Sequence, residues 1–183
     1  MSILHRPEVK LPLDSLKKEG GNSIEAIRFS FVESFRQMVR FDVEALKPGD
    51  DDYIEFGNDT KVPLISAVKL IECETELEWA AYPIAIILIR RLMKSNDYCI
   101  NINNMHRLML VSLLIASKII EDCPSSNRCF SKSIGFKESS LKEMEIEFLK
   151  CLEFKLHVTL EEVNAVLSEW CLNRDWIGSI ELI

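Results

Sequence analysis

Between Gly57 and Gly135 the chain contains no glycine, and its only prolines in this stretch are Pro63, Pro83 and Pro124. Proline is tolerated in the first turn of a helix but not in its interior, whereas glycine often marks turns and helix ends. Long glycine-free segments punctuated by single prolines are therefore typical of helices. Strand-like alternation of apolar and polar residues is hard to find anywhere in the chain. We expect an all-α domain.

Apolar residues that recur at three- and four-residue steps predict the positions of the helices. They cover residues 23–46, 63–77, 83–94, 103–121, 127–135 and 140–152, and a last helix follows Thr159. Asn127 and Thr159 are expected to cap their helices, and Ser140 with Glu143 has the spacing of a capping box. The helix at 103–121 is apolar on nearly every side, so it should be the central, surrounded one.

The formal charge of the chain is -7, from 22 basic and 29 acidic side chains. A protein that neutralises nucleic-acid phosphates needs a basic surface, and anionic membranes attract basic segments, so we expect neither partner. The start of the sequence lacks the apolar core of a secretory signal, and the longest apolar runs are too short to span a bilayer. The sequence indicates a soluble intracellular protein.

Residue types that carry chemistry do not gather in recognisable patterns. The six cysteines form no C-x-x-C pair and the three histidines do not pair at ligand spacing, so no metal site is expected. There is no glycine-rich phosphate loop and no nucleophile with a nearby base. We therefore expect no cofactor, no small-molecule substrate and no catalytic residue.

Two charged residues lie on apolar helix faces. At 100° per residue Glu145 falls in the middle of the apolar face of its helix, and Lys118 lies among apolar residues of the central helix. A carboxylate in such a stripe needs a partner or hydrogen-bond donors, so the two are natural partners across the helix interface. Glu121, one turn from Lys118, is placed to join the same patch. From the residues alone the pair is either a private ion pair that closes a helical bundle or a rigid donor–acceptor spot for another protein's backbone.

Two runs of sequence resemble the cyclin box. They are Leu113-Leu-Ile-Ala-Ser-Lys118-Ile-Ile-Glu-Asp and Met144-Glu145-Ile-Glu-Phe-Leu-Lys-Cys-Leu-Glu-Phe-Lys-Leu156, with matching spacing between them. The intervening run Asn127-Arg-Cys-Phe-Ser-Lys-Ser-Ile-Gly135 is similar to the single-box P/U-type cyclins, which are related to the phosphate-pathway cyclins of fungi. The resemblance covers roughly residues 60 to 160.

The resemblance implies a five-helix cyclin box at residues 60–158, with a flanking N-terminal helix at 23–47 and a C-terminal helical extension at 159–183. Residues 1–22 are expected to be a flexible leader. The implied function is that of a regulatory subunit, not an enzyme, which forms a heterodimer with a cyclin-dependent kinase and activates it. The implied compartment is the cytoplasm or nucleus of a eukaryotic cell.

In the cyclin family the lysine of the A-S-K run and the glutamate of the M-E run grip main-chain groups that precede the αC helix of the kinase. Here these residues are Lys118 and Glu145. The resemblance also implies that αC lies in an apolar groove. The expected kinase-binding residues are Lys118, Glu145, Glu121, Ile115, Ile119, Leu149 and Leu156.

The sequence departs from the family at Arg90-Arg91, where cyclins usually show Asp-Arg, and it has no arginine from residue 41 to 89. The common ion pair between the first two box helices is therefore missing. Arg90 and Arg91 suit either a bound phosphate group or the C-terminal end of a helix. Two other functions also stay open: a cyclin-fold scaffold that touches DNA, and an adaptor that sequesters a partner without activating a kinase.

Overall fold

The computed structural model describes residues 23–39, 62–96, 100 and 104–172. This part of the chain contains seven helices and no strand, and one isolated β-bridge joins Val39 to Ile100. The predicted all-α fold is confirmed. The expected flexible leader at residues 1–22 lies outside the described residues. No described helix has both the length and the apolar character needed to cross a membrane.

The helices agree closely with those expected from the apolar periodicity. They are α2 (Ser23–Met38), α3 (Leu64–Thr75), α4 (Ala81–Asn96), α5 (Met105–Ile120), α6 (Asn127–Ser133), α7 (Glu138–Cys151) and α8 (Leu160–Leu172). The exception is the end of α2, which was expected near Leu46. Helix α2 ends at Met38, the next residue, Val39, forms the bridge to Ile100, and residues 40–46 lie outside the described part.

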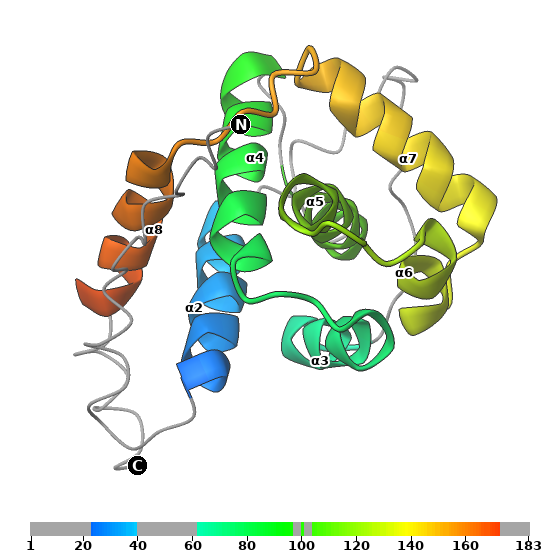
Figure 1. Ribbon diagram of the computed structural model, residues 1–183, viewed down its shortest axis with the longest axis horizontal. Helices are drawn as coiled ribbons and strands as arrows, with labels where there is room; N and C mark the ends of the chain where they lie inside the picture. The colour runs from blue at the N-terminus through cyan, green and yellow to red at the C-terminus, as the bar shows by residue number, and fades with distance from the viewer. Residues whose placement is uncertain (1–22, 40–61, 97–99, 101–103, 173–183) are drawn as a thin grey trace, which may run out of the picture.

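Helix α5 is the centre of the domain. In Figure 1 it is seen nearly end-on, with α3, α4, α6 and α7 around it. Every residue from Leu108 to Ser117 is buried, which confirms the prediction of a helix surrounded on all sides. The hydroxyls of Ser112 and Ser117 donate to carbonyl oxygens one turn earlier, so these buried polar groups keep hydrogen-bond partners.

Helix α2 packs on α3 and α4 through an apolar stripe and one half-buried polar cluster. Phe31 of the stripe is fully buried, and its ring centroid lies 5.1 Å from that of Tyr82. Arg28 Nη2 lies 2.6 Å from Glu72 Oε2 of α3, and the Tyr82 hydroxyl of α4 donates to the other oxygen of Glu72. The Glu72 carboxylate therefore joins three helices.

Helix α8 lies along α4, and two arginines of α4 fasten it there (Figure 1). Arg90 donates to both oxygens of Glu169, at 3.2 and 2.6 Å. Arg91 donates to Glu162 Oε1 at 2.6 Å and to two main-chain carbonyls of the segment that precedes α8. Arg90 and Arg91, which occupy the positions expected for Asp-Arg, therefore bind α8 to α4.

The beginning of α8 is a capping box. Thr159 Oγ1 accepts from the Glu162 N–H at 3.3 Å, and Glu162 Oε2 accepts from the Thr159 N–H at 2.8 Å. The prediction that Thr159 caps this helix is confirmed. The capping box predicted for Ser140 and Glu143 is wrong, because α7 already begins at Glu138 and both residues lie inside the helix.

Candidate functional site

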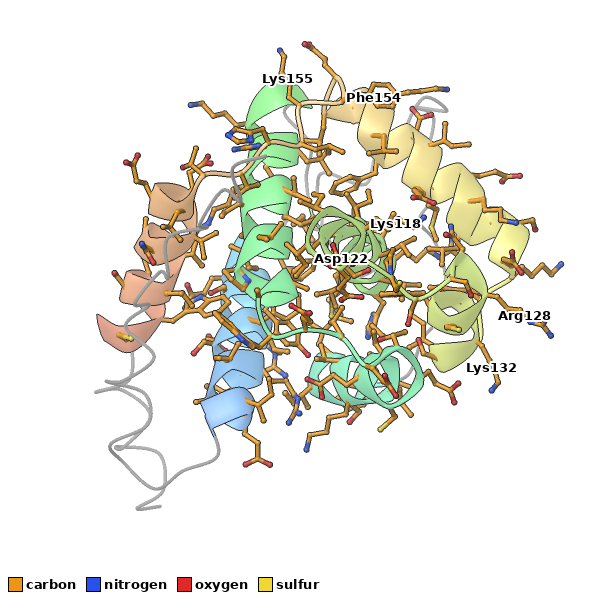
Figure 2. The ribbon with its side chains drawn as sticks, viewed as in Figure 1. Lys118, Asp122, Arg128, Lys132, Phe154 and Lys155 are labelled. Atoms are coloured by element: carbon orange, nitrogen blue, oxygen red, sulfur yellow. The ribbon has the colours of Figure 1, made fainter. Side chains whose placement is uncertain are left out.

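Lys118 and Glu145 form an ion pair across the interface between α5 and α7. Lys118 Nζ lies 2.6 Å from Glu145 Oε1, as their positions on apolar helix faces predicted. Figure 2 shows Lys118 on the side of α5 that faces α6 and α7. The side chains are 33% and 16% exposed, so the pair lies at the edge of the core, where a partner can still reach it.

The backbone positions of both charges follow from local structure. Lys118 is in the last turn of α5, where a cation is favoured by the exposed carbonyl oxygens of the helix end. On α7, Leu141, Met144 and Phe148 are buried and fix the face on which Glu145 stands. The Glu145 side chain therefore projects from α7 next to the buried apolar side chains that pack this helix onto the core.

Asn127 is a third member of this cluster. Its Oδ1 accepts from Lys118 Nζ at 2.7 Å, and its Nδ2 donates to Glu145 Oε2 at 2.7 Å. The expectation that Asn127 caps α6 is wrong, since the cap is Ser126, whose Oγ accepts from the Cys129 N–H at 3.4 Å. Sequence reasoning missed the contacts of Asn127 with Lys118 and Glu145 because they depend on how α6 meets α5 and α7 in space. Lys118, Asn127 and Glu145 are called the polar ring below.

Glu121 does not join the polar ring. Its Oε1 accepts from the main-chain N–H of Glu78, in the loop between α3 and α4, at 3.4 Å. Burial raises the pKa of the Glu121 carboxyl above its ordinary value, and the hydrogen bond from the Glu78 N–H works against that rise. The structure therefore directs Glu121 toward the α3–α4 loop, whereas the sequence placed it beside Lys118.

The four apolar residues expected near the ring differ in exposure. Ile115 is 2% exposed and belongs to the core, whereas Ile119, one turn later on α5, is 37% exposed. Leu149 and Leu156 are partly buried and pack against the core. Of the residues expected to line an apolar groove, Ile119 is therefore accessible, Leu149 and Leu156 are partly accessible, and Ile115 is not.

Phe154 extends the apolar surface at the end of α7. It is 65% exposed, and both Phe154 and Glu153 have left-handed backbone conformations, with φ of 56° and 50°. The Phe154 N–H donates to the Leu149 carbonyl at 2.9 Å, which holds this turn against α7. Figure 2 shows Phe154 beyond the end of that helix. Sequence reasoning missed it because a phenylalanine is more often a core residue, and its exposure depends on the left-handed turn.

The chemistry available at this face is recognition by hydrogen bonds and apolar contact. Within the described residues, no group of three or more His, Cys, Asp or Glu side chains is placed to hold a metal ion. In the described part of the chain, the cysteines at 73, 123, 129 and 171 are free thiols. A charged pair flanked by exposed apolar side chains is suited to a protein partner that offers both main-chain polar groups and apolar contacts.

Comparisons with known proteins point to one family. The family model described as Cyclin matches residues 59–156, which include the polar ring and helices α3 to α7. Cyclin-U2-1 and Cyclin-U2-2 of Arabidopsis thaliana are each 34% identical to the chain over 97 residues, or 52% of the chain and 42% and 40% of their own lengths. Cyclin-P2-1 of Oryza sativa subsp. japonica is 28% identical over 90 residues, 49% of the chain and 40% of its own length. The chain spans about two fifths of the length of these relatives.

Proposed function

The chain belongs to the cyclin family, and we propose that it binds a cyclin-dependent kinase and activates it. Its similarity to U-type and P-type cyclins agrees with the resemblance in the sequence and makes it a cyclin-type regulator. The observation that carries the proposal is the Lys118–Glu145 pair, held half-buried where α5, α6 and α7 meet.

The chemistry of the pair suits a peptide backbone. The ammonium of Lys118 donates hydrogen bonds and the carboxylate of Glu145 accepts them, so together they can bind the carbonyl and N–H groups of a main chain. Because both groups are held near the protein core, little side-chain entropy remains to be lost when a partner binds. Ile119 near the end of α5 and Phe154 after the end of α7 are exposed, so both are available for apolar contact with a partner.

Kinase activation by such a surface is an effect on a conformational equilibrium. A protein kinase holds ATP correctly only when a glutamate of αC pairs with the lysine of its β3 strand. A partner that binds the αC-in state more tightly than the αC-out state shifts the population toward the active form. The proposed role of Lys118 and Glu145 is to supply that difference in affinity through main-chain groups that precede αC.

The proposal is tested by titrating the chain into each of a set of purified cyclin-dependent kinases and measuring the rate of peptide phosphorylation. We expect at least one kinase to be activated by the wild-type chain. Lys118→Ala and Glu145→Ala should each require about tenfold to a hundredfold more chain for half-maximal activation, since each leaves its partner charge half-buried and unpaired.

The matched control is Lys142→Ala, which removes an exposed lysine paired with Glu138 at 2.7 Å on the outer side of α7. This variant should activate the kinase like wild type. If Lys118→Ala and Glu145→Ala activate as well as the control, the residue assignment is wrong. If the wild-type chain binds kinases without raising their activity, the chain is an adaptor, and if it binds none of them the kinase proposal itself fails.

A further inference from the structure

We propose that Asn127 is a positioning residue of this docking surface, which fixes the orientation of Glu145 and Lys118 before a partner arrives. The inference rests on the proposed function, because it concerns the same two charged groups. It assigns a role to a residue on a third helix, which the sequence had placed only at a helix cap.

The three side chains form a closed ring of hydrogen bonds. Lys118 Nζ donates to Glu145 Oε1 at 2.6 Å and to Asn127 Oδ1 at 2.7 Å, and Asn127 Nδ2 donates to Glu145 Oε2 at 2.7 Å. Each oxygen of the carboxylate is thus held by a different residue. A carboxylate bonded through one oxygen can rotate, whereas one held at both oxygens has a single orientation.

An amide is the side chain that this position requires. Asparagine carries an acceptor and a donor on one short side chain, so its oxygen can face the Lys118 ammonium while its nitrogen faces the Glu145 carboxylate. An aspartate could accept from Lys118, but it would place a second negative charge beside Glu145 and could not donate to it. An alanine would leave Oε2 of Glu145 without this donor.

The loop before α6 holds the amide in place. Ser126 caps α6 directly before Asn127, and Ser125 Oγ donates to the Thr75 carbonyl at the end of α3 at 2.8 Å. The start of α6 is therefore fixed by one contact to α3 and by its own cap, and Asn127 is held by the ring as well. Its orientation does not depend on a bound partner.

The ring leaves defined groups for that partner. An ammonium has three N–H donors, of which Lys118 spends two within the ring, and a carboxylate has about four acceptor sites, of which Glu145 uses two. One donor and two acceptor sites therefore remain, in directions that Asn127 sets. A main chain that binds them meets a pre-oriented pair, which reduces the ordering cost of association.

The test compares three substitutions at this position, measured as dissociation constants for the kinase that the wild-type chain activates. Asn127→Ala should weaken binding about fivefold to tenfold, because the Glu145 side chain must then be ordered when the partner binds. Asn127→Asp should weaken it more, whereas Asn127→Gln keeps both amide functions and should recover part of the loss. Arg128→Ala is the matched control, because Arg128 is the next residue of α6 and projects away from Lys118 (Figure 2).

Thermal unfolding of the same variants separates positioning from folding. Asn127 is only half-buried, so Asn127→Ala should change Tm no more than the Arg128→Ala control does, within about 2 °C. Unchanged affinity of Asn127→Ala, or a loss of affinity matched by an equal loss of stability, would overturn the proposal. So would an Asn127→Gln variant no better than Asn127→Ala.

A measurement without any kinase distinguishes failure of this inference from failure of the proposed function. In a ¹⁵N-labelled chain, the side-chain NH₂ resonance of Asn127 should move and exchange faster in Glu145→Ala, but stay in place in Glu143→Ala, whose residue is exposed on α7. If the Asn127 resonance is unchanged in Glu145→Ala, the hydrogen bond between Asn127 and Glu145 is contradicted. If it responds while no kinase binds, Asn127 does orient Glu145 and the kinase proposal alone has failed.

Discussion

Trp170 Nε1 donates a 2.7 Å hydrogen bond to Ser34 Oγ and so ties α8 to α2. These two helices lie outside the region that matches the cyclin family, and both pack on α4, within it. Trp170 is 5% exposed, and the two arginines of α4 hold the same helix through Glu162 and Glu169. The flanking helices are therefore attached to the cyclin domain both by buried side chains and by ion pairs at the surface.

The Trp170–Ser34 hydrogen bond should contribute measurably to stability. Ser34→Ala leaves a buried indole N–H without its acceptor and should lower the free energy of unfolding by about 1 kcal/mol. The measurement is urea-induced unfolding followed by circular dichroism. Ser168→Ala is the control, since this exposed α8 hydroxyl bonds only to the Asn164 carbonyl of its own helix. Equal losses in the two variants would contradict the contribution of the bridge between helices.

The docking of α8 should depend on pH through Glu162. The hydrogen bond from the Thr159 N–H, followed by that from Arg91, lowers the pKa of the Glu162 carboxyl below its ordinary value of 4.5. A carboxyl with a lowered pKa in the folded state stabilises the fold above that ordinary value, and this contribution is lost as the pH falls toward the folded pKa. Wild type should therefore be more stable than Glu162→Gln at pH 7, and the difference should shrink below about pH 4.5. Unfolding curves measured from pH 3 to 7 whose difference does not change with pH would contradict this prediction.

Among the polar groups between α2, α3 and α4, the Glu72 carboxylate should cause the largest loss of unfolding free energy when it is removed. Glu72→Ala leaves the Arg28 charge half-buried and unpaired, and should cost about 3 kcal/mol of unfolding free energy. Tyr82→Phe removes only the hydroxyl that donates to Glu72 and should cost about 1–2 kcal/mol. Glu74→Ala, whose partner Lys132 is exposed, should cost less than about 1 kcal/mol. Chemical denaturation of the three variants tests this ranking, and a different order would contradict it.

Phe154 should affect stability and binding in opposite directions. Its φ of 56° is unfavourable for a residue with a side chain, so Phe154→Gly should leave stability unchanged or raise it by about 1 kcal/mol. The same variant loses an exposed aromatic ring beside the proposed docking face and should bind the kinase several-fold more weakly. Glu153→Gly removes a similar backbone strain, at φ 50°, without removing an apolar contact, so its kinase affinity should match wild type. Equal kinase affinity of Phe154→Gly and Glu153→Gly would contradict a role of Phe154 in docking.

The helices and the central charge pair could be predicted from the sequence because each depends on a local pattern. The all-round apolar character of residues 108–116 predicts a surrounded helix, and α5 is that helix. The angular position of Glu145 on α7 predicts a charge at the edge of the core, and a buried charge requires a partner. Periodicity is sufficient for both inferences.

The other contacts depend on how the helices meet in space, which periodicity does not specify. Asn127 reaches Lys118 and Glu145 only because the loop after α5 lets α6 pack against both α5 and α7. Arg90 and Arg91 have acidic partners more than sixty residues away, on a helix whose direction the sequence leaves open. Phe154 is exposed because its turn is left-handed, and nothing in the run Glu153-Phe154-Lys155 signals that conformation.

The most direct test of kinase docking at the polar ring is hydrogen–deuterium exchange of the chain, free and in complex with a purified cyclin-dependent kinase. Docking at the ring predicts slower amide exchange at residues 118–127 and 145–156, with unchanged exchange in α8. Glu145→Ala, at the same kinase concentration, should lose most of this protection. Protection confined to α8 or to the outer face of α3, or a complex that leaves residues 118–127 and 145–156 unaffected, would contradict docking at this site.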